Sequence, residues 1–586
     1  MPDSPTELRV RIGGEAGFGI KAAGQMLARS FVDAGLETFD LTEYPSLIRG
    51  GHNNYLLRVS TEPVYSHVEP VDALICLNRE TLDLHHHELV DGGAVIFDPE
   101  DFGAADVPAR LRAVPVPLTE IARGAGGKIM RNTVALGALL GIVGFPLSYL
   151  GDSLHKQFAK KAPEIAEGNV TAAQAGCDAA MAACPDFIVQ LAPIKGAPRR
   201  ILVDGNEALG MGALAAGIGF YAAYPMTPAS SILHFMAAHE REYGVVVKHT
   251  EDEIAAMNMV VGAAFGGTRA MTASAGGGFA LMVEAFGMAG ASESAVVVCV
   301  LTRPGPATGL ATWTEQSDLR YVIHAAQGEF PRVVLAPGDR EDAFDLTWRA
   351  FNLADQLQTP VVILGDSYLP DNRQSTPAYD LSEVTIDRGK LVTEGEVPAE
   401  ALGTDGRYLR YKVTEDGVSV RALPGVKGAN QLGNSYEHDE YGFGSEGEPA
   451  ETRIAQNEKR MRKMELAEKL VPPPAYFGAP PESAEIGLLF FGTTKGPVRE
   501  AARMLEREGV KAALMQVVTV FPFPAEEVAA FLGSVPKTLI VEGNFTGQLE
   551  GLVRQECLLA VEHSLHRYDG RPFTPEEIVR KVKEVL

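Results

Sequence analysis

The stretch LRVRIGGEAGFGIKAAGQMLARSFVDAG, residues 8–35, decides the fold at the start of the chain. Its first residues alternate apolar and charged side chains, which is typical of a strand. Four glycines follow, and the apolar residues after them recur with the spacing of a helix. The stretch therefore predicts a strand, a glycine-rich loop and a helix, which is the repeating unit of α/β proteins.

The same alternation of buried strands and helical segments recurs along most of the chain, as in AVVVCVLTRP (residues 295–304) and TPVVILGDSYLP (residues 359–370). With 586 residues the chain is too long for one core. We therefore expect an α/β protein of several domains with mostly parallel sheets. The predicted domains are residues 1–195, residues 196–375, an extended connector with one helix at 376–480, and residues 481–586.

Charge and cysteine content limit the kinds of partner. A net charge of −24 argues against nucleic acid or an anionic membrane surface. The five cysteines include no CxxC pair, so we expect the chain to form neither a zinc ribbon nor an iron–sulfur cluster by itself. Scattered unpaired thiols, and the lack of an apolar run long enough to cross a bilayer, predict a cytoplasmic protein.

The glycine-rich loop is the first candidate binding site. Where a strand feeds a helix, glycines let the backbone approach an anion, and the free N–H groups of the helix bind it. The loop predicts phosphate or pyrophosphate binding at Gly13, Gly14, Gly17 and Gly19. The alternative is a tight turn that needs glycine for steric reasons.

Two further stretches of the first domain contain residues that often form sites. Arg49, which precedes a Gly-Gly pair and His52, is a candidate anion ligand, although most surface arginines are simply solvated. The triplet His85, His86 and His87 has no second cluster of ligands near it in the sequence. We expect this triplet to be a solvated segment rather than a metal site.

The stretch HTEDEIAAMNMVVGAAFGG, residues 249–267, places carboxylates directly before a long apolar segment. Thr250 and Glu253 have the spacing of a capping box, in which each side chain satisfies a backbone N–H at the start of a helix. Alternatively, Glu253 is a desolvated carboxylate that accepts a proton or a hydrogen bond from a cofactor. Spacing alone favours the cap.

Thr227 and Arg303 are further candidates in the second domain. Thr227 lies between two prolines in YPMTP, so its hydroxyl either donates to a substrate or belongs to an ordinary turn. Arg303 follows directly after a buried apolar strand. The carboxyl end of a parallel strand is where ligands bind in α/β sheets, which makes Arg303 a well-placed cation for a carboxylate.

Several motifs in order resemble one family. YPMTPAS, EDEIAAMNMVVGAAFGGTRAMTASAGGGFALM and RPGPATGLATWTEQSDL resemble the pyrimidine-binding domain of thiamine-diphosphate-dependent 2-oxoacid:ferredoxin oxidoreductases. GGEAGFGIKAAG, YPSLIRGGHNN and GNVTAAQAG resemble the γ domain of the same enzymes, and VEGNFTGQLEGLVR resembles their transketolase-C-like domain. The order of γ before α, with RYKVTEDGVSVRALPG and NSYEHDEYG, is most similar to the α subunit of 2-oxoglutarate:ferredoxin oxidoreductases.

The resemblance implies roles for the candidate residues. Glu253 occupies the position of the acidic residue that contacts N1′ of the thiamine aminopyrimidine, which favours the tautomer that deprotonates the thiazolium C2. Thr227 and Arg303 are then expected to hold the carboxylate and keto group of the substrate. The family associates its γ domain with coenzyme A, which fits the glycine-rich loop and Arg49. With this resemblance, the catalytic interpretation of Glu253 outweighs the cap.

The resemblance also implies partners and cofactors. Thiamine diphosphate is expected to be shared with a β subunit, which supplies Mg²⁺, the diphosphate site and a [4Fe–4S] cluster, because this chain shows no motif for them. The complex is expected to be (αβ)₂, to pass electrons to ferredoxin and to require coenzyme A. The implied reaction is the oxidative decarboxylation of 2-oxoglutarate to succinyl-CoA and CO₂, or its reverse.

Three alternatives remain at the level of sequence. The same chemistry on pyruvate or a branched-chain 2-oxoacid requires no second cation, whereas 2-oxoglutarate requires one, for which the candidates are Arg49, Lys248, His249 and Arg269. A nucleotide-binding dehydrogenase, with the first loop as its dinucleotide site, is disfavoured because residues 13–19 lack the GxGxxG spacing and because of the motifs after residue 200. A non-catalytic subunit is disfavoured because Glu253, Thr227 and Arg303 occur together.

Overall fold

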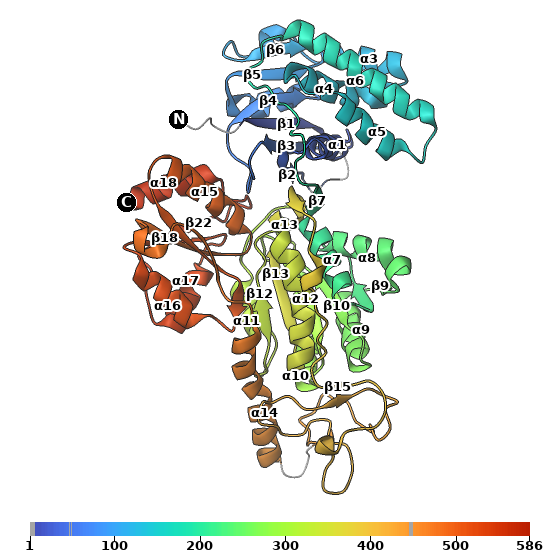
Figure 1. The fold of residues 1–586 in the computed structure, drawn as a ribbon, viewed down its shortest axis with the longest axis vertical. Helices are drawn as coiled ribbons and strands as arrows, with labels where there is room; N and C mark the ends of the chain where they lie inside the picture. Colours follow the sequence, from blue (N-terminus) through green and yellow to red (C-terminus); the bar gives the residue numbers. More distant parts are fainter. Residues whose placement is uncertain (1–5, 46, 48–49, 445–448) are drawn as a thin grey trace. The chain divides into compact units, whose positions relative to one another are not determined.

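The computed structural model describes residues 6–45, 47, 50–444 and 449–586. The chain forms two compact units: residues 1–204, 371–378 and 574–577 make the first, and residues 205–370, 379–573 and 578–586 make the second. Both are built from strands and helices in alternation, which confirms the expected α/β class (Figure 1). Within the described residues, no helix combines the length and apolar content that a membrane crossing requires.

The first unit is built on an eight-stranded mixed sheet. Strands β6, β5, β4 and β1 are parallel neighbours, and β3, β2, β14 and β7 continue the sheet with antiparallel pairs. The strands are β1 (Glu7–Glu15), β2 (Glu37–Glu43), β3 (His52–Ser60), β4 (Val71–Cys76), β5 (Leu89–Phe97), β6 (Arg112–Pro115), β7 (Arg200–Asp204) and β14 (Arg373–Pro377).

The helices of the first unit pack closely where their residues are small. A Cβ on Gly137 would lie 2.0 Å from the backbone oxygen of Ala173, and one on Gly176 would lie 2.1 Å from that of Val134. These glycines therefore set the close approach of α4 and α6. The helices are α1 (Ile20–Asp33), α2 (Arg79–His85), α3 (Leu118–Ala125), α4 (Arg131–Ile142), α5 (Ser148–Phe158) and α6 (Pro163–Ala183).

The first unit extends beyond the boundary expected near residue 195. Strand β7 pairs with β14, so residues 373–377 return to the first sheet after six of the seven strands of the next sheet. The sequence between 371 and 378 shows no local sign of this return, because a short strand finds its partner through the tertiary structure.

The second unit contains a seven-stranded sheet of order β20-β12-β13-β11-β10-β8-β9. All of its neighbours are parallel except β20, which is antiparallel to β12. Every residue of the central strand β11 is buried, as expected for a strand covered on both faces. The strands are β8 (Phe220–Ala223), β9 (Val246–His249), β10 (Ala270–Ser274), β11 (Val296–Thr302), β12 (Val333–Leu335), β13 (Val361–Asp366) and β20 (Thr519–Phe521).

A five-stranded sheet of order β17-β19-β18-β21-β22 forms the C-terminal part of the second unit. Apolar residues of this part, including Leu489 and Val517, share a core with Val298 and Phe279 of the seven-stranded sheet and its helices. The two sheets are therefore packed into one continuous core. The strands are β17 (Ala475–Gly478), β18 (Ile486–Phe491), β19 (Ala512–Val517), β21 (Thr538–Glu542) and β22 (His563–His566).

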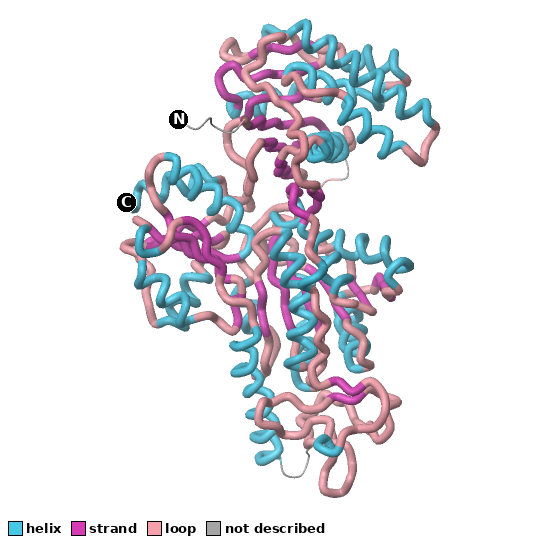
Figure 2. Tube along the Cα trace, in the orientation of Figure 1, coloured by secondary structure: helices cyan, strands magenta, loops and turns pink. Residues whose placement is uncertain are grey.

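Helices of the second unit accompany both sheets (Figure 2). They are α7 (Gly205–Ala215), α8 (Ser230–Tyr243), α9 (Glu253–Phe265), α10 (Gly276–Ala291), α11 (Leu319–His324), α12 (Arg340–Leu357), α14 (Pro449–Leu470), α15 (Lys495–Arg507), α16 (Ala525–Ser534) and α17 (Gln548–Cys557). Two more, α13 (Tyr368–Asp371) and α18 (Pro575–Val585), include residues of both units.

The described residues between Tyr379 and Leu470 have little regular structure apart from α14, two three-residue 3₁₀ helices and the short strands β15 (Leu391–Val392) and β16 (Arg421–Ala422). This segment is held by buried charges. Glu293 accepts hydrogen bonds of 2.6 Å from Lys459 on one carboxylate oxygen and from Lys463 on the other. These contacts fasten α14 to the turn that follows α10.

Candidate functional site

Four neighbouring parallel strands of the second unit end at the same edge of their sheet. Strands β8, β9, β10 and β11 are adjacent and parallel, so their carboxyl ends lie together. The residues that follow them include Thr227, Glu253 and Arg303, and Ser274 is the last residue of β10. The three candidates named from the sequence are thus brought to the edge where α/β sheets bind ligands.

Helix α9 is capped by a residue other than the predicted pair. Its N-cap is Asp252, whose Oδ1 accepts a hydrogen bond of 2.7 Å from the backbone N–H of Ala255. The hydroxyl of Thr250 donates to the backbone oxygen of Asp252. The capping-box alternative for Thr250 and Glu253 is therefore wrong, because Asp252 already supplies the capping oxygen.

Glu253 is left as a buried carboxylate that does not cap the helix. It is 3% exposed, and the hydroxyl of Ser274 lies 3.4 Å from its Oε1. Among the described residues, no lysine or arginine forms an ion pair with it. A buried carboxylate without a cation is costly unless a ligand completes its environment.

The first turn of α10 consists of glycines that make room for this carboxylate. A Cβ on Gly278 would lie 2.5 Å from Oε1 of Glu253 and 2.0 Å from the hydroxyl of Ser274. A Cβ on Gly276 would lie 2.0 Å from Oδ2 of Asp318. The carboxylates of Glu253 and Asp318 therefore lie against the start of α10, in the space that a side chain at Gly278 or Gly276 would otherwise fill.

Asp318 is a site residue that the sequence analysis missed. Burial, and secondarily the negative charge of Glu315, raise the pKa of Asp318 from 3.8 to about 6. Its place directly after a loop rich in glycine and proline was the available signal, but nothing in the sequence relates it to Gly276. Ser274, also missed, could have been found as the last residue of a buried strand.

The side chain of Arg303 is oriented by a hydrogen bond to the backbone of Thr227, the other candidate for substrate binding. Its Nη1 donates a hydrogen bond of 2.7 Å to the backbone oxygen of Thr227. Burial lowers the pKa of Arg303 from its ordinary value, yet a guanidinium stays charged at neutral pH. An arginine has five N–H donors, so the described contacts leave donors free for an anionic ligand.

The position of Arg269 excludes it as the cation that binds the second carboxylate of the substrate. Arg269 precedes β10 at the opposite edge of the sheet and is buried, with its Nε 2.9 Å from Oδ2 of Asp355. It also donates to Asn352. The proposal of Arg269 as a ligand is therefore wrong, whereas Lys248 and His249 lie exposed at the carboxyl end of β9.

In the first unit, the glycine-rich segment predicted as a loop begins inside β1: Gly13 and Gly14 pair with β3, and only the residues after Glu15 form the connection to α1. Gly17 and Gly19 have φ angles of 93° and 74°, a conformation that favours glycine. Gly13 needs the absence of a side chain for another reason, because a Cβ there would lie 2.5 Å from Thr81. Gly14 is similarly close to Leu77, at 3.0 Å. The glycines therefore meet the steric requirements of a turn and of close packing, and anion binding at this loop stays a prediction.

The remaining candidates of the first unit have different outcomes. Arg49 lies outside the described residues. The expectation of a solvated His85 is wrong: this side chain is 8% exposed, its Nε2 lies 2.8 Å from Nε2 of His52, and its Nδ1 lies 2.8 Å from Glu88. In the described ranges, no three His, Cys, Asp or Glu residues are grouped to hold a metal ion.

Comparisons with known proteins agree with this architecture. Residues 9–179 match the family model of pyruvate ferredoxin/flavodoxin oxidoreductase. Residues 211–459 match its thiamine-diphosphate-binding domain, and residues 484–578 match core domain II of pyruvate:ferredoxin oxidoreductase. The fold and the site thus define a thiamine-diphosphate-dependent enzyme that oxidises 2-oxoacids.

Relatives make the assignment more specific. The α subunit of 2-oxoacid:ferredoxin oxidoreductase 2 from Aeropyrum pernix is 33% identical over 99% of this chain and 98% of its own. The 2-oxoglutarate oxidoreductase subunit KorA of Mycobacterium tuberculosis is 28% identical over 98% and 91%. The solved 2-oxoglutarate:ferredoxin oxidoreductase of Magnetococcus marinus is 32% identical, with a TM-score of 0.92 over 99% of this chain and 100% of its own. The chain belongs to the 2-oxoacid:ferredoxin oxidoreductase family, as an α subunit.

Proposed function

We propose that this chain is the α subunit of a 2-oxoglutarate:ferredoxin oxidoreductase. The reaction is the coenzyme A-dependent decarboxylation of 2-oxoglutarate to succinyl-CoA and CO₂, with electrons passed to ferredoxin, or the reverse carboxylation. The main support is the meeting of Glu253, Thr227 and Arg303 at one sheet edge. The Magnetococcus marinus enzyme, which has 2-oxoglutarate, coenzyme A and succinyl-CoA bound, supports the substrate.

The residues at this edge fit the aminopyrimidine of thiamine diphosphate. Glu253 is buried, caps no helix and has an incomplete set of hydrogen bonds, so its carboxylate is available to N1′ of the ring. Of the glycines that begin α10, Gly277 leaves room for a flat ring, because the nearest atom that a Cβ there would meet is the backbone oxygen of Ala307 at 3.7 Å. Bound thiamine diphosphate supplies a nucleophilic carbon and an electron sink for the 2-oxoacid. In the bound complex Glu253 would hold a proton at N1′ of the ring.

Arg303 and Thr227 orient the 2-oxoacid. The guanidinium is already fixed by the backbone oxygen of Thr227, so it can bind the substrate carboxylate without much loss of side-chain freedom. The hydroxyl of Thr227 donates to the keto oxygen. Lys248 and His249, at the neighbouring strand end, are the described candidates for the distal carboxylate of 2-oxoglutarate.

The first unit is proposed to bind coenzyme A through the loop of Gly13, Gly14, Gly17 and Gly19, together with Arg49. A β subunit is proposed to supply Mg²⁺, the rest of the diphosphate site and a [4Fe–4S] cluster, in an (αβ)₂ complex that reduces ferredoxin.

The test uses this chain purified with its partner subunit under anaerobic conditions. Reduction of methyl viologen is followed with coenzyme A, thiamine diphosphate, Mg²⁺ and a panel of 2-oxoacids. We expect strong reduction with 2-oxoglutarate that is lost in Glu253→Ala and weakened in Arg303→Ala. Activity confined to pyruvate or a branched-chain 2-oxoacid would replace the proposed substrate and keep the site. A cluster-loaded complex that oxidises no 2-oxoacid would refute the proposal.

A further inference from the structure

The loop from Arg303 to Asp318 connects two residues of the candidate site. It begins directly after β11 and ends directly before α11. Arg303 at its start contacts Thr227, and Asp318 at its end contacts the first turn of α10. The contacts that hold the backbone of this loop therefore determine the positions of both Arg303 and Asp318.

The backbone of this loop is held by the C-terminal part of the second unit. The backbone N–H of Thr314 donates to the oxygen of Gly570 at 2.9 Å, and that of Gln316 donates to the oxygen of Gly543 at 2.6 Å. In return, the N–H of Gly543 donates to Oε1 of Gln316 at 2.8 Å. These bonds join the loop to the segments that follow β21 and β22.

The side chain of Gln316 is buried and saturated with contacts. Its amide nitrogen lies 3.1 Å from the backbone oxygen of Phe491 and 3.5 Å from Oδ2 of Asp366. Asp366, at the end of β13, also accepts hydrogen bonds from the hydroxyls of Thr314 and Thr493, at 2.8 Å and 2.6 Å. Loop, seven-stranded sheet and C-terminal part thus meet around one carboxylate.

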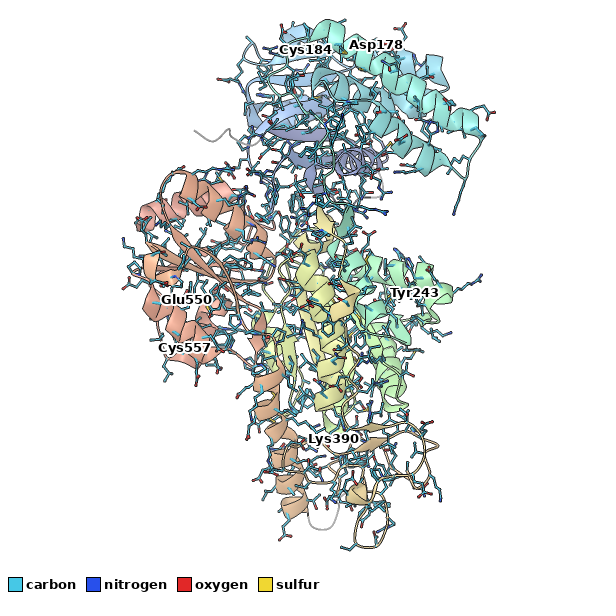
Figure 3. The ribbon with its side chains drawn as sticks, in the orientation of Figure 1. Asp178, Cys184, Tyr243, Lys390, Glu550 and Cys557 are labelled. Carbon is cyan, nitrogen blue, oxygen red and sulfur yellow. The ribbon has the colours of Figure 1, made fainter. Side chains whose placement is uncertain are left out.

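Gln548, the first residue of α17, bridges the end of the loop. Its Nε2 donates to the backbone oxygen of Ser317 at 2.6 Å, and its Oε1 accepts from the backbone N–H of Arg320 at 2.9 Å. The amide group therefore spans Asp318 and sets the backbone on both sides of it. Helix α17 is shown with Glu550 and Cys557 in Figure 3.

The start of α17 is itself anchored by a buried carboxylate. Oε2 of Glu542 accepts hydrogen bonds from the backbone N–H of Leu549 at 2.8 Å and from the side chain of Asn544 at 2.7 Å. Oε1 accepts from the N–H of Glu550 at 3.1 Å. Negative charge at a helix N-terminus is stabilising, so this contact holds Gln548 in place. The motif VEGNFTGQLEGL therefore contains both the anchoring carboxylate, Glu542, and the residue that it holds, Gln548.

We propose that Gln548 and Gln316 are positioning residues that set the substrate loop between Arg303 and Asp318. Apolar contacts alone would bury the loop without fixing the path of its backbone. Buried side-chain amides fix that path, because a buried backbone group that loses its hydrogen bond is costly. The inference rests on the proposed function, in which Arg303 binds the carboxylate of the 2-oxoacid. The C-terminal part of the chain is then required for substrate affinity although it lies outside the residues that bind substrate.

The test compares Gln548→Met with Gln555→Met in the complex with the partner subunit. Gln555 lies on the same helix but is exposed, and its amide contacts only the neighbouring Glu556. We expect Gln548→Met to raise the KM for the 2-oxoacid roughly ten-fold, with a much smaller change in kcat and an unchanged KM for coenzyme A. Gln555→Met is expected to keep all three values.

The outcomes separate this inference from the proposed function. An unchanged KM for the 2-oxoacid in a folded Gln548→Met complex would overturn the positioning role, even if the thermal midpoint fell. If that variant does not fold, Gln548→Glu replaces it, since it keeps the acceptor for Arg320 and loses only the donor to Ser317, and the same rise in KM is expected. A wild type that oxidises a 2-oxoacid other than 2-oxoglutarate would correct the proposed substrate, and the comparison would be made with that acid.

Discussion

Arg303 and Thr227 lie 76 residues apart in the sequence, yet a guanidinium nitrogen of the first donates a hydrogen bond of 2.7 Å to the backbone oxygen of the second. They follow β11 and β8, which are separated in the sheet by β10. A backbone atom of the chain itself therefore orients the arginine. Because its alignment depends on a backbone atom, substitution of the Thr227 side chain alone is expected to leave this contact intact.

Replacement of Glu253 is expected to abolish turnover without unfolding the chain. Glu253→Gln keeps the shape of the side chain and removes the proton acceptor, so we expect kcat to fall by about 10²–10⁴-fold. Steady-state kinetics of the complex measures this. The control is Asp252→Asn, which preserves a capping oxygen at the adjacent position and is expected to keep most of the activity. Equal losses in both variants would mean that the helix start, rather than the carboxylate, is what matters.

Addition of one methyl group at Gly278 is expected to disturb the site. A Cβ there would lie 2.0 Å from Ser274 Oγ and 2.5 Å from Glu253 Oε1, so Gly278→Ala must displace both side chains. We expect activity to fall by roughly 10²-fold and the free energy of unfolding to fall by about 1–3 kcal/mol. Gly533→Ala on α16 should instead be neutral or slightly stabilising, because a Cβ at this position would meet no atom within 4 Å beyond its own stretch of helix. A fully active Gly278→Ala enzyme would contradict the close approach at Glu253.

The stability of the protein should depend on the ionisation of Asp318. Its pKa is raised from 3.8 to about 6, first by burial and then by Glu315. The folded state therefore binds a proton that the unfolded state releases, so the stabilising contribution is complete below the ordinary pKa and is lost as the pH rises through about 6. The side chain of the Asp318→Asn variant does not titrate. Between pH 4 and pH 7 its free energy of unfolding should therefore rise by up to about 2 kcal/mol relative to that of the wild type. Thermal midpoints of the two proteins that shift in parallel across this range would disprove the raised pKa.

The buried charges around Glu293 should contribute unequally to stability. Glu293→Gln leaves Lys459 and Lys463 without their carboxylate, and we expect the free energy of unfolding to fall by about 3–5 kcal/mol. Lys459→Met should cost less, because burial lowers the pKa of Lys459 to about 7 and Lys463 still pairs with Glu293. Denaturant unfolding measures both. Asp345→Asn, which breaks an exposed pair with Arg349, is the control and should change stability by less than about 0.5 kcal/mol. A larger loss in Lys459→Met than in Glu293→Gln would reverse this ranking.

Local patterns were sufficient for the elements of the fold. The strand, glycine-rich loop and helix of residues 8–35 form as β1 and α1, because periodicity and glycine positions act within one short segment. The same holds for the strand that ends before Arg303, since an uninterrupted apolar run predicts a buried parallel strand. The small faces of α4 and α6 were likewise readable, because close helix packing requires glycine and alanine.

Contacts between distant segments could not be predicted in this way. Even within one turn, spacing was not enough: it favoured a capping box at Thr250, but the cap is Asp252, whose side chain accepts from the N–H of Ala255 three residues later. Arg269 is bound by Asp355, 86 residues later, and His85 is buried against His52.

The sequence by itself therefore determined the elements, the identity of the catalytic candidates and the family. The tertiary structure alone decided that residues 373–377 return to the first sheet, that Asp318 meets Gly276 and that Gln548 holds the substrate loop. The physical reason is that hydrogen bonds and packing between segments depend on distances that the chain acquires only when it is folded, whereas periodicity acts between neighbours in the sequence.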